Sequence, residues 1–171
     1  AVLVSGMLGD HGVAILSQRE GLAFAADVVS DSAALHTLAA QLIAACPSLR
    51  LMRDPTRGGL ATTLNEIAVQ SGVGIRLDEA AIPVRPVVRA ACEFLGLDPL
   101  YCANEGKLTA ICAAADAPAL LAALRAHPLG QDAAIIGEVI ADPRCFVRAR
   151  TPFGGERLVD WLNGEMLPRI C

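Results

Sequence analysis

Cys171, the last residue of the sequence, has the side chain best suited to carry a chemical group. It ends the segment Leu-Pro-Arg-Ile-Cys at residues 167–171. A cysteine thiolate is a nucleophile and can bond covalently to a transferred group. The α-carboxylate of the same residue disfavours the thiolate, so this sulfur suits a carrier that other proteins load. The residues after Gly164 span about 23 Å at about 3.3 Å per residue. The alternative is a frayed chain end without a function.

Glu105 is the candidate for acid–base chemistry. It lies in the segment Ala-Asn-Glu-Gly-Lys at residues 103–107, between a predicted loop and a predicted strand. A carboxylate beside a glycine can be held at the mouth of a cleft, where desolvation turns such a group into a general base. The alternative is a solvated turn in which Glu105 and Lys107 form an exposed pair.

Two glycines, Gly58 and Gly59, stand at the start of a predicted helix in the turn Arg-Asp-Pro-Thr-Arg-Gly-Gly. Each glycine costs backbone entropy on the order of 1 kcal/mol, so a simple cap would use one serine or aspartate instead. Glycines let a ligand approach the backbone, and a helix N-terminus offers free N–H groups to an anion. Arg57 adds positive charge. The alternative is a tight turn in which Asp54 caps the helix and Arg57 is solvated.

A second glycine-rich turn, Gly-Asp-His-Gly at residues 9–12, precedes another predicted helix. His11 is a proton donor, a ligand contact or a helix-start residue, and the residues themselves favour the structural role. No metal site is predicted, because the six cysteines form no Cys-x-x-Cys pair and no histidine has zinc-finger spacing. The candidates for binding a phosphate, a nucleotide or the C-terminal segment are Asp10, His11, Asp54, Arg57, Gly58, Gly59 and Asn104.

The composition predicts one domain with an aliphatic core. The chain has 171 residues, 54% of them hydrophobic and only 4% aromatic. The net charge of −4, without a cluster of basic residues, argues against a nucleic-acid surface. No apolar run approaches the roughly 18 residues of a membrane span, and the first residues lack the basic region of a signal peptide. We expect a reduced, cytoplasmic protein whose sequence begins at a domain boundary.

Hydrophobic periodicity and turn residues predict an α+β fold with helices packed on a mixed β-sheet. Asp31 or Ser32 is expected to cap the second helix, and Leu158, Trp161 and Leu162 have helical spacing in the final segment. Strands are predicted at residues 2–5, 49–53, 73–77, 107–114, 133–139 and 145–150. Helices are predicted at residues 13–18, 33–45, 60–70, 87–95 and 117–126.

Five segments together resemble the C-terminal half of the HypE family, the carbamoyl dehydratases of [NiFe]-hydrogenase maturation. The Asp-Pro-Thr-Arg-Gly-Gly turn alone indicates only the wider superfamily of aminoimidazole ribonucleotide synthetase and selenophosphate synthetase. The Pro-Arg-Ile-Cys ending narrows the resemblance to HypE. The segments are residues 9–12, 53–61, 97–101, 103–107 and 168–171.

The resemblance implies a domain organisation. Residues 1–163 would form the C-terminal domain of the aminoimidazole ribonucleotide synthetase-like fold, and residues 164–171 a flexible tail that ends in the carrier cysteine. An N-terminal domain, which the sequence lacks, would bind most of the ATP and Mg²⁺ and form the main surface of a homodimer. This chain by itself would then be inactive.

The resemblance also implies a reaction. The carbamoyltransferase HypF would load a carbamoyl group onto Cys171, and ATP would phosphorylate the oxygen of that group. A base, which we assign to Glu105, would remove N–H protons as phosphate leaves, and the resulting cyano group would pass to iron held by the HypC–HypD complex. Two alternatives stay open: a carrier and docking module without catalysis, and another phosphoryl-transfer enzyme of the superfamily, which would need no terminal cysteine.

Overall fold

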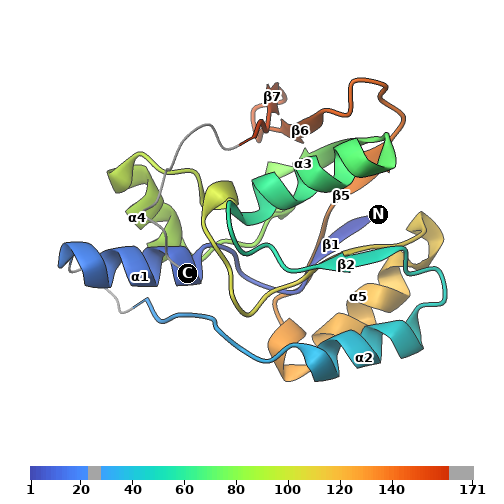
Figure 1. Cartoon of the computed structure of the whole chain (residues 1–171), viewed down its shortest axis with the longest axis horizontal. Helices are drawn as coiled ribbons and strands as arrows, with labels where there is room; N and C mark the ends of the chain where they lie inside the picture. Colours follow the sequence, from blue (N-terminus) through green and yellow to red (C-terminus); the bar gives the residue numbers. More distant parts are fainter. Residues whose placement is uncertain (23–27, 162–171) are drawn as a thin grey trace.

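A single mixed sheet of seven strands forms the centre of the computed structural model, which describes residues 1–22 and 28–161 (Figure 1). The strand order is β2-β4-β1-β5-β3-β6-β7, and every neighbouring pair is antiparallel except β3 and β6, which are parallel. The strands are β1 (Val2–Val4), β2 (Leu51–Arg53), β3 (Gly74–Asp78), β4 (Thr109–Ile111), β5 (Ala134–Ile140), β6 (Val147–Arg150) and β7 (Glu156–Leu158). This architecture confirms the predicted α+β class.

Five α-helices pack around the sheet, and local sequence explains where several of them stop or start. Gly72 and Gly96 end two of the helices in the left-handed conformation, which glycine adopts without strain. Pro86 begins one helix at the position where a missing N–H group costs nothing. The helices are α1 (Asp10–Glu20), α2 (His36–Ala45), α3 (Gly59–Ser71), α4 (Pro86–Leu95) and α5 (Ala117–Arg125), and short 3₁₀ turns include η2 (Pro99–Tyr101) and η4 (Pro128–Gly130).

The sheet separates two apolar cores. Side chains of a strand alternate between its two faces, so Val2 and Val4 of β1 pack with α3 on one face while Leu3 packs with α2 and α5 on the other. All three side chains are fully buried. Figure 1 shows α3 on one side of the sheet and the α2–α5 pair on the opposite side. The middle layer is therefore the sheet itself, and it carries the predicted motifs on its connecting loops.

A third, smaller core lies between α1 and α4. Val13 of α1 packs there against Val88, Ala91 and Cys92 of α4, and Cys102 joins them from the segment after η2. This cluster fixes the start of α1 beside the loop that carries Glu105. The described cysteines, residues 46, 92, 102, 112 and 145, are all free thiols, and all but Cys145 are buried.

Two local predictions were wrong. The second helix begins at His36 instead of residue 33, its N-cap residue is Leu35, and neither Asp31 nor Ser32 caps it. Leu158 belongs to strand β7, which pairs with β6, so the apparent helical spacing of the final segment does not form a helix in the described residues. Three apolar residues are too few to distinguish a helix from an edge strand.

Parts of the predicted domain organisation fall outside the described residues. These include Leu162 and the whole segment 164–171 with Cys171, so the tail stays a prediction. In the parts of the chain that the structure does describe, no helix is both long enough and apolar enough to cross a membrane.

Candidate functional site

Asn104 joins three of the sequence motifs. Its Oδ1 atom accepts a hydrogen bond from the Gly9 N–H at 2.8 Å, and its Nδ2 group donates to the carbonyl oxygens of Pro55 and Cys102 at 3.1 and 2.9 Å. Its own N–H also donates to the Pro55 carbonyl at 3.1 Å. The side chain is fully buried, and a buried amide requires such partners for its donors and acceptor. Asn104 therefore holds the two glycine-rich turns against the loop that carries Glu105.

The two glycines of the turn before α3 are required by the packing of the chain itself. A Cβ atom on Gly59 would lie 2.5 Å from the Leu100 carbonyl oxygen and 2.6 Å from that of Cys102. A Cβ atom on Gly58 would lie 2.2 Å from Thr62 Oγ1. Both glycines have positive φ angles, of 74° and 63°, which side chains disfavour. Close approach of a ligand is thus not needed to explain the glycine pair, and its role in phosphate binding stays a prediction.

The N-termini of α1 and α3 converge on the segment 102–104. Gly12, in the first turn of α1, donates its N–H to the Ala103 carbonyl, and Gly59 begins α3 against the carbonyl of Cys102. The N-cap residues are Gly9 and Gly58, and neither helix has a side-chain cap. The alternative in which Asp54 caps α3 was therefore wrong. Two helix N-termini add partial positive charge beside Asn104, which is favourable for an anion.

Asp54 and Arg57 lie on the surface of the turn before α3. Both residues are exposed, whereas Pro55 between them is buried and accepts the bonds from Asn104. The structure thus brings the backbone of this turn to the Glu105 loop and leaves the two charged side chains at its rim. Their predicted contact with phosphates remains a prediction.

Asp10 faces a polar cavity of about 290 Å³ next to the same loop. Its side chain is only 3% exposed and pairs with Arg85 at 3.2 Å, while its Oδ1 atom forms no hydrogen bond within the described residues. Burial raises the pKa of Asp10, although Arg85 and Lys107 act in the opposite direction. Asp31 and Lys107 also line this cavity. A buried carboxylate repels a phosphate, so Asp10 fits the predicted role of a phosphate contact poorly.

His11 makes a contact within the chain that fits the structural alternative, and its predicted role in binding stays a prediction. Its Nδ1 atom lies 2.8 Å from the Ser30 hydroxyl, and the residue is 9% exposed. This contact attaches the start of α1 to the segment 28–35, which has no regular secondary structure and leads into α2.

Glu105 and Lys107 do not form the exposed pair considered as the alternative. The Lys107 ammonium lies 2.9 Å from Asp31 Oδ2, and the Glu105 N–H donates to Asp31 Oδ1 at 3.1 Å. Glu105 itself is partly buried. Sequence reasoning missed Asp31 as a member of this site because it placed the residue at a helix cap. The sequence feature that pointed to a charged partner at this site is Lys107, the one lysine among 14 basic residues, which directly follows Glu105 and Gly106.

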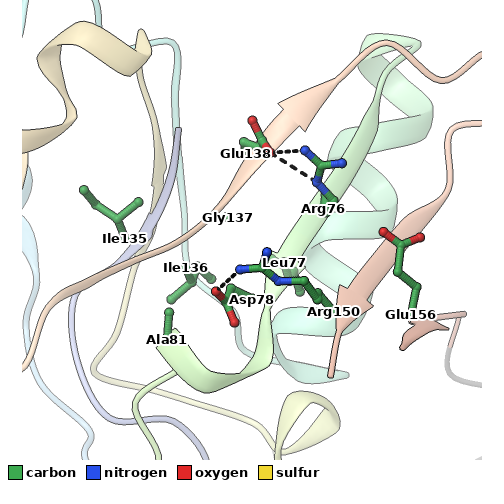
Figure 2. Close-up of a pocket in the computed structure, with 10 residues that line it drawn as sticks. All are labelled: Arg76, Leu77, Asp78, Ala81, Ile135, Ile136, Gly137, Glu138, Arg150 and Glu156. Carbon is green, nitrogen blue, oxygen red and sulfur yellow. Dashed lines mark hydrogen bonds and ion pairs between the residues drawn. The ribbon is translucent and has the colours of Figure 1, made fainter. Parts of the chain in front are cut away.

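A larger hollow, of about 460 Å³, lies apart from these motifs on the face of β3, β5 and β6 (Figure 2). Four of its charged side chains form pairs across the strands: Arg76 contacts Glu138 at 2.5 Å, and Arg150 contacts Asp78 at 2.6 Å. The fifth, Glu156, lies 3.9 Å from Arg148, outside the hollow. Such exposed pairs are typical of a solvated sheet face. Among the residues at 1–22 and 28–161, no group of three or more His, Cys, Asp or Glu side chains could hold a metal ion.

Comparisons with known proteins agree with the motifs. The chain is 71% identical over 171 residues to the carbamoyl dehydratase HypE of Cupriavidus necator and 68% identical over 170 residues to that of Azotobacter vinelandii. The alignments cover 100% and 99% of this chain but only 49% and 50% of those relatives. The chain thus spans about half the length of the curated relatives that it matches.

Solved structures share the fold over nearly the whole chain. A crystal structure of the hydrogenase maturation protein HypE has a TM-score of 0.95 at 53% identity and covers 100% of this chain and 55% of that one. HypE in complex with ATP has a TM-score of 0.94 at 52% identity, and covers 100% and 52%. A HypE–HypF complex has a TM-score of 0.90 at 43% identity, and covers 94% and 52%.

The family itself follows from a match to most of the chain. Residues 1–150 match the model of the AIR synthase related protein, C-terminal domain. The first six strands of the mixed sheet and both glycine-rich turns that meet at Asn104 lie within these matched residues. The chain therefore belongs to the AIR synthase related protein family, as a C-terminal domain of that family.

Proposed function

We propose that this chain is half of an enzyme that dehydrates an S-carbamoyl group on Cys171 to a thiocyanate with the use of ATP, and so supplies cyanide ligands for the iron of [NiFe]-hydrogenase. High identity to proteins named carbamoyl dehydratase HypE supports this. The observation that carries the proposal is the gathering of both glycine-rich turns and the Glu105 loop around one buried amide, Asn104.

The reaction requires the loss of one oxygen and two N–H protons from the carbamoyl group. The amide oxygen is a poor leaving group, so it first attacks the terminal phosphorus of ATP and releases ADP. Loss of one N–H proton gives a phosphorylated intermediate with a carbon–nitrogen double bond. A base then takes the second N–H proton, the C–O bond breaks, phosphate leaves, and the carbon–nitrogen triple bond forms on the carbon attached to sulfur. We assign the base to Glu105. A general base must stay within hydrogen-bond reach of its proton, and the anchoring of the Glu105 loop supports this assignment.

The parts of this chain that would face ATP are the N-termini of α1 and α3. Their N–H groups and partial positive charge suit phosphate oxygens, and Arg57 at the rim adds a full charge. Mg²⁺ prefers several oxygen ligands. We place Mg²⁺ and most ATP contacts in the other half of the full-length protein, together with the homodimer surface.

The partners and the location belong to the same proposal. A solved complex named HypE–HypF contains a chain that is 43% identical to this one, which supports HypF as the loading partner. The HypC–HypD complex would receive the cyano group. A cytoplasmic location is supported by the five free thiols of the described residues, since reduced cysteines are typical of that compartment.

A mass measurement on the full-length protein tests the proposal. After carbamoylation, addition of ATP should remove the mass of one water from the protein. Cys171→Ala should prevent both the loading and the loss of water. Glu105→Gln should load normally and then lose water far more slowly, because the amide cannot accept a proton.

The same experiment separates the alternatives. Normal dehydration by Glu105→Gln would reject Glu105 as the base. Loading of this half alone, without any later ATP-dependent loss of water in the full-length protein, would leave only the carrier and docking module. Turnover that survives removal of Ile170 and Cys171 would favour a different phosphoryl-transfer reaction of the superfamily.

A further inference from the structure

Asp31 connects the residues on both sides of Gly106. Its Oδ1 atom accepts the Glu105 N–H at 3.1 Å, and its Oδ2 atom accepts a hydrogen bond from Lys107 Nζ at 2.9 Å. The Asp31 and Lys107 side chains are only 4% and 13% exposed. A charged pair that is shielded from water in this way keeps its geometry better than a surface pair does. One carboxylate therefore fixes the loop immediately before and after Gly106.

Backbone packing restrains the same loop independently. A Cβ atom on Gly106 would lie 1.6 Å from the Asp31 carbonyl oxygen, so the two backbones are in direct contact. The stem of Lys107 passes over Gly6, where a Cβ atom would lie 3.1 Å from Lys107 Cε. The loop therefore packs directly against the backbone of Asp31, and its lysine packs against Gly6.

The preceding residue is fixed as well. Asn104 is tied to Gly9 and Pro55, as described above. Glu105 thus stands between two anchored neighbours, Asn104 on one side and the Asp31–Lys107 pair on the other. Asp31 comes from an irregular segment, and Ser30 fastens that segment to His11. This arrangement restrains the backbone from which the Glu105 side chain projects.

We propose that Asp31 is a positioning residue for Glu105, and that its carboxylate, paired with Lys107, sets the place of the Glu105 backbone during dehydration of the carbamoyl group. This inference rests on the proposed function, because it presumes that Glu105 is the base. Asp31 acts through Glu105 and not on the substrate. A misplacement of about 1 Å in a reacting group can cost about 100-fold in rate.

The test uses single-turnover dehydration in the full-length, carbamoyl-loaded protein. Asp31→Ala removes both contacts and should slow dehydration by about 10- to 100-fold, with loading by mass and the KM for ATP changed less than about twofold. Asp31→Asn keeps an oxygen for the Glu105 N–H but loses the charge opposite Lys107. Its dehydration rate should therefore lie between that of the unchanged protein and that of Asp31→Ala. In a Glu105→Gln background, Asp31→Ala should cause no further loss, because residues that act as a unit are not additive.

Two further variants separate positioning from a loss of folding. Asp31→Leu combined with Lys107→Leu removes both buried charges and should regain thermal stability, while the rate stays low. Asp142→Asn alters a similarly buried carboxylate. Asp142 lies in the connection between β5 and β6 and pairs with Arg148 of β6 at 3.0 Å. This control should lose stability without a change in dehydration rate.

Three outcomes would overturn the inference. The first is a normal dehydration rate in Asp31→Ala when Glu105→Gln is strongly impaired. The second is a further loss of rate when Asp31→Ala is added to Glu105→Gln, and the third is recovery of both rate and thermal stability in the double leucine variant. Normal dehydration by Glu105→Gln would instead refute the proposed base itself. The failure of the positioning role and the failure of the proposed function are therefore distinguishable.

Discussion

Single residues in this site are defined by partners that lie far away in the sequence. Asp31 contacts Glu105 and Lys107, which are 74 and 76 positions later. The residues next to Asp31 in the sequence indicate only the start of a helix. They therefore favour the interpretation that Asp31 caps that helix. Glu105 and Asn104 were predicted as site residues because their motif is local and continuous. Partners supplied by tertiary contacts could not be predicted in this way.

The carboxylate of Asp10 is buried in surroundings that disfavour its negative charge. One of its carboxylate oxygens is buried without a hydrogen bond, and the pKa of Asp10 is raised by burial. The folded state therefore binds the proton more tightly than the unfolded state. The stability that the protonated group contributes is lost as the pH rises from the ordinary value of 3.8 through the raised pKa.

Asp10→Asn should therefore stabilise the protein at neutral pH by about 1 kcal/mol, because a neutral amide removes a buried charge of which one oxygen has no hydrogen bond. Arg85, which is 55% exposed, can be solvated when its partner is lost. The measurement is the melting temperature of both proteins between pH 3 and pH 7. The gain should vanish below about pH 3.8, where the carboxyl group is protonated in both states. A gain of the same size at every pH would contradict this explanation.

Among the elements, the turns before α1 and α3 are placed by close backbone contacts that only glycine allows. The sequence located both turns, both helices and most strands, because proline, glycine and hydrophobic periodicity are local signals. It did not explain why α3 needs two glycines. Gly59 is required by the backbone of η2 and Cys102, which approaches it from about 40 residues further along the chain, and Gly58 is required by the nearby Thr62 side chain. The error at β7 has the same origin, since the pairing with β6 determines that segment.

Gly59→Ala should destabilise the protein by more than about 2 kcal/mol, since it adds a backbone clash to the cost of a positive φ angle. Gly72→Ala is the matched control. Its φ angle of 64° is nearly the same, but a Cβ atom there would meet nothing within 4 Å. The control should cost only about 1 kcal/mol. Urea denaturation of both variants measures the difference, and equal losses would show that the contact with η2 is not rigid.

At the scale of the whole molecule, the sheet is covered unevenly. The α2–α5 pair covers one face of β1 and β4, and α3 packs on the opposite face, where it contacts β3 and β6. Figure 2 shows charged side chains on the face of β3 and β5 that points away from α3. The fold class and these layers follow from hydrophobic patterning. The strand order does not, because it depends on pairings between distant segments.

Hydrogen exchange should reflect this uneven cover. The amides of β1 should exchange most slowly, because Val2, Leu3 and Val4 are fully buried and β1 pairs with strands on both sides. The amides of β7 should exchange fastest among the strands, since β7 pairs only with β6 at the edge of the sheet. Mass spectrometry of peptides from native-state exchange measures both. Equal protection of β1 and β7 would contradict the prediction.

The strand order also determines when the sheet can form during synthesis. None of the first three strands pairs with another of them: β1 needs β4 and β5, β2 needs β4, and β3 needs β5 and β6. When residues 1–100 of this sequence have left the ribosome, the three strands that they contain therefore have no pairing partner among the residues already made. Helices can form early on the nascent polypeptide, but the sheet must wait for residues beyond 109, which leaves the earliest apolar strands in need of protection until then.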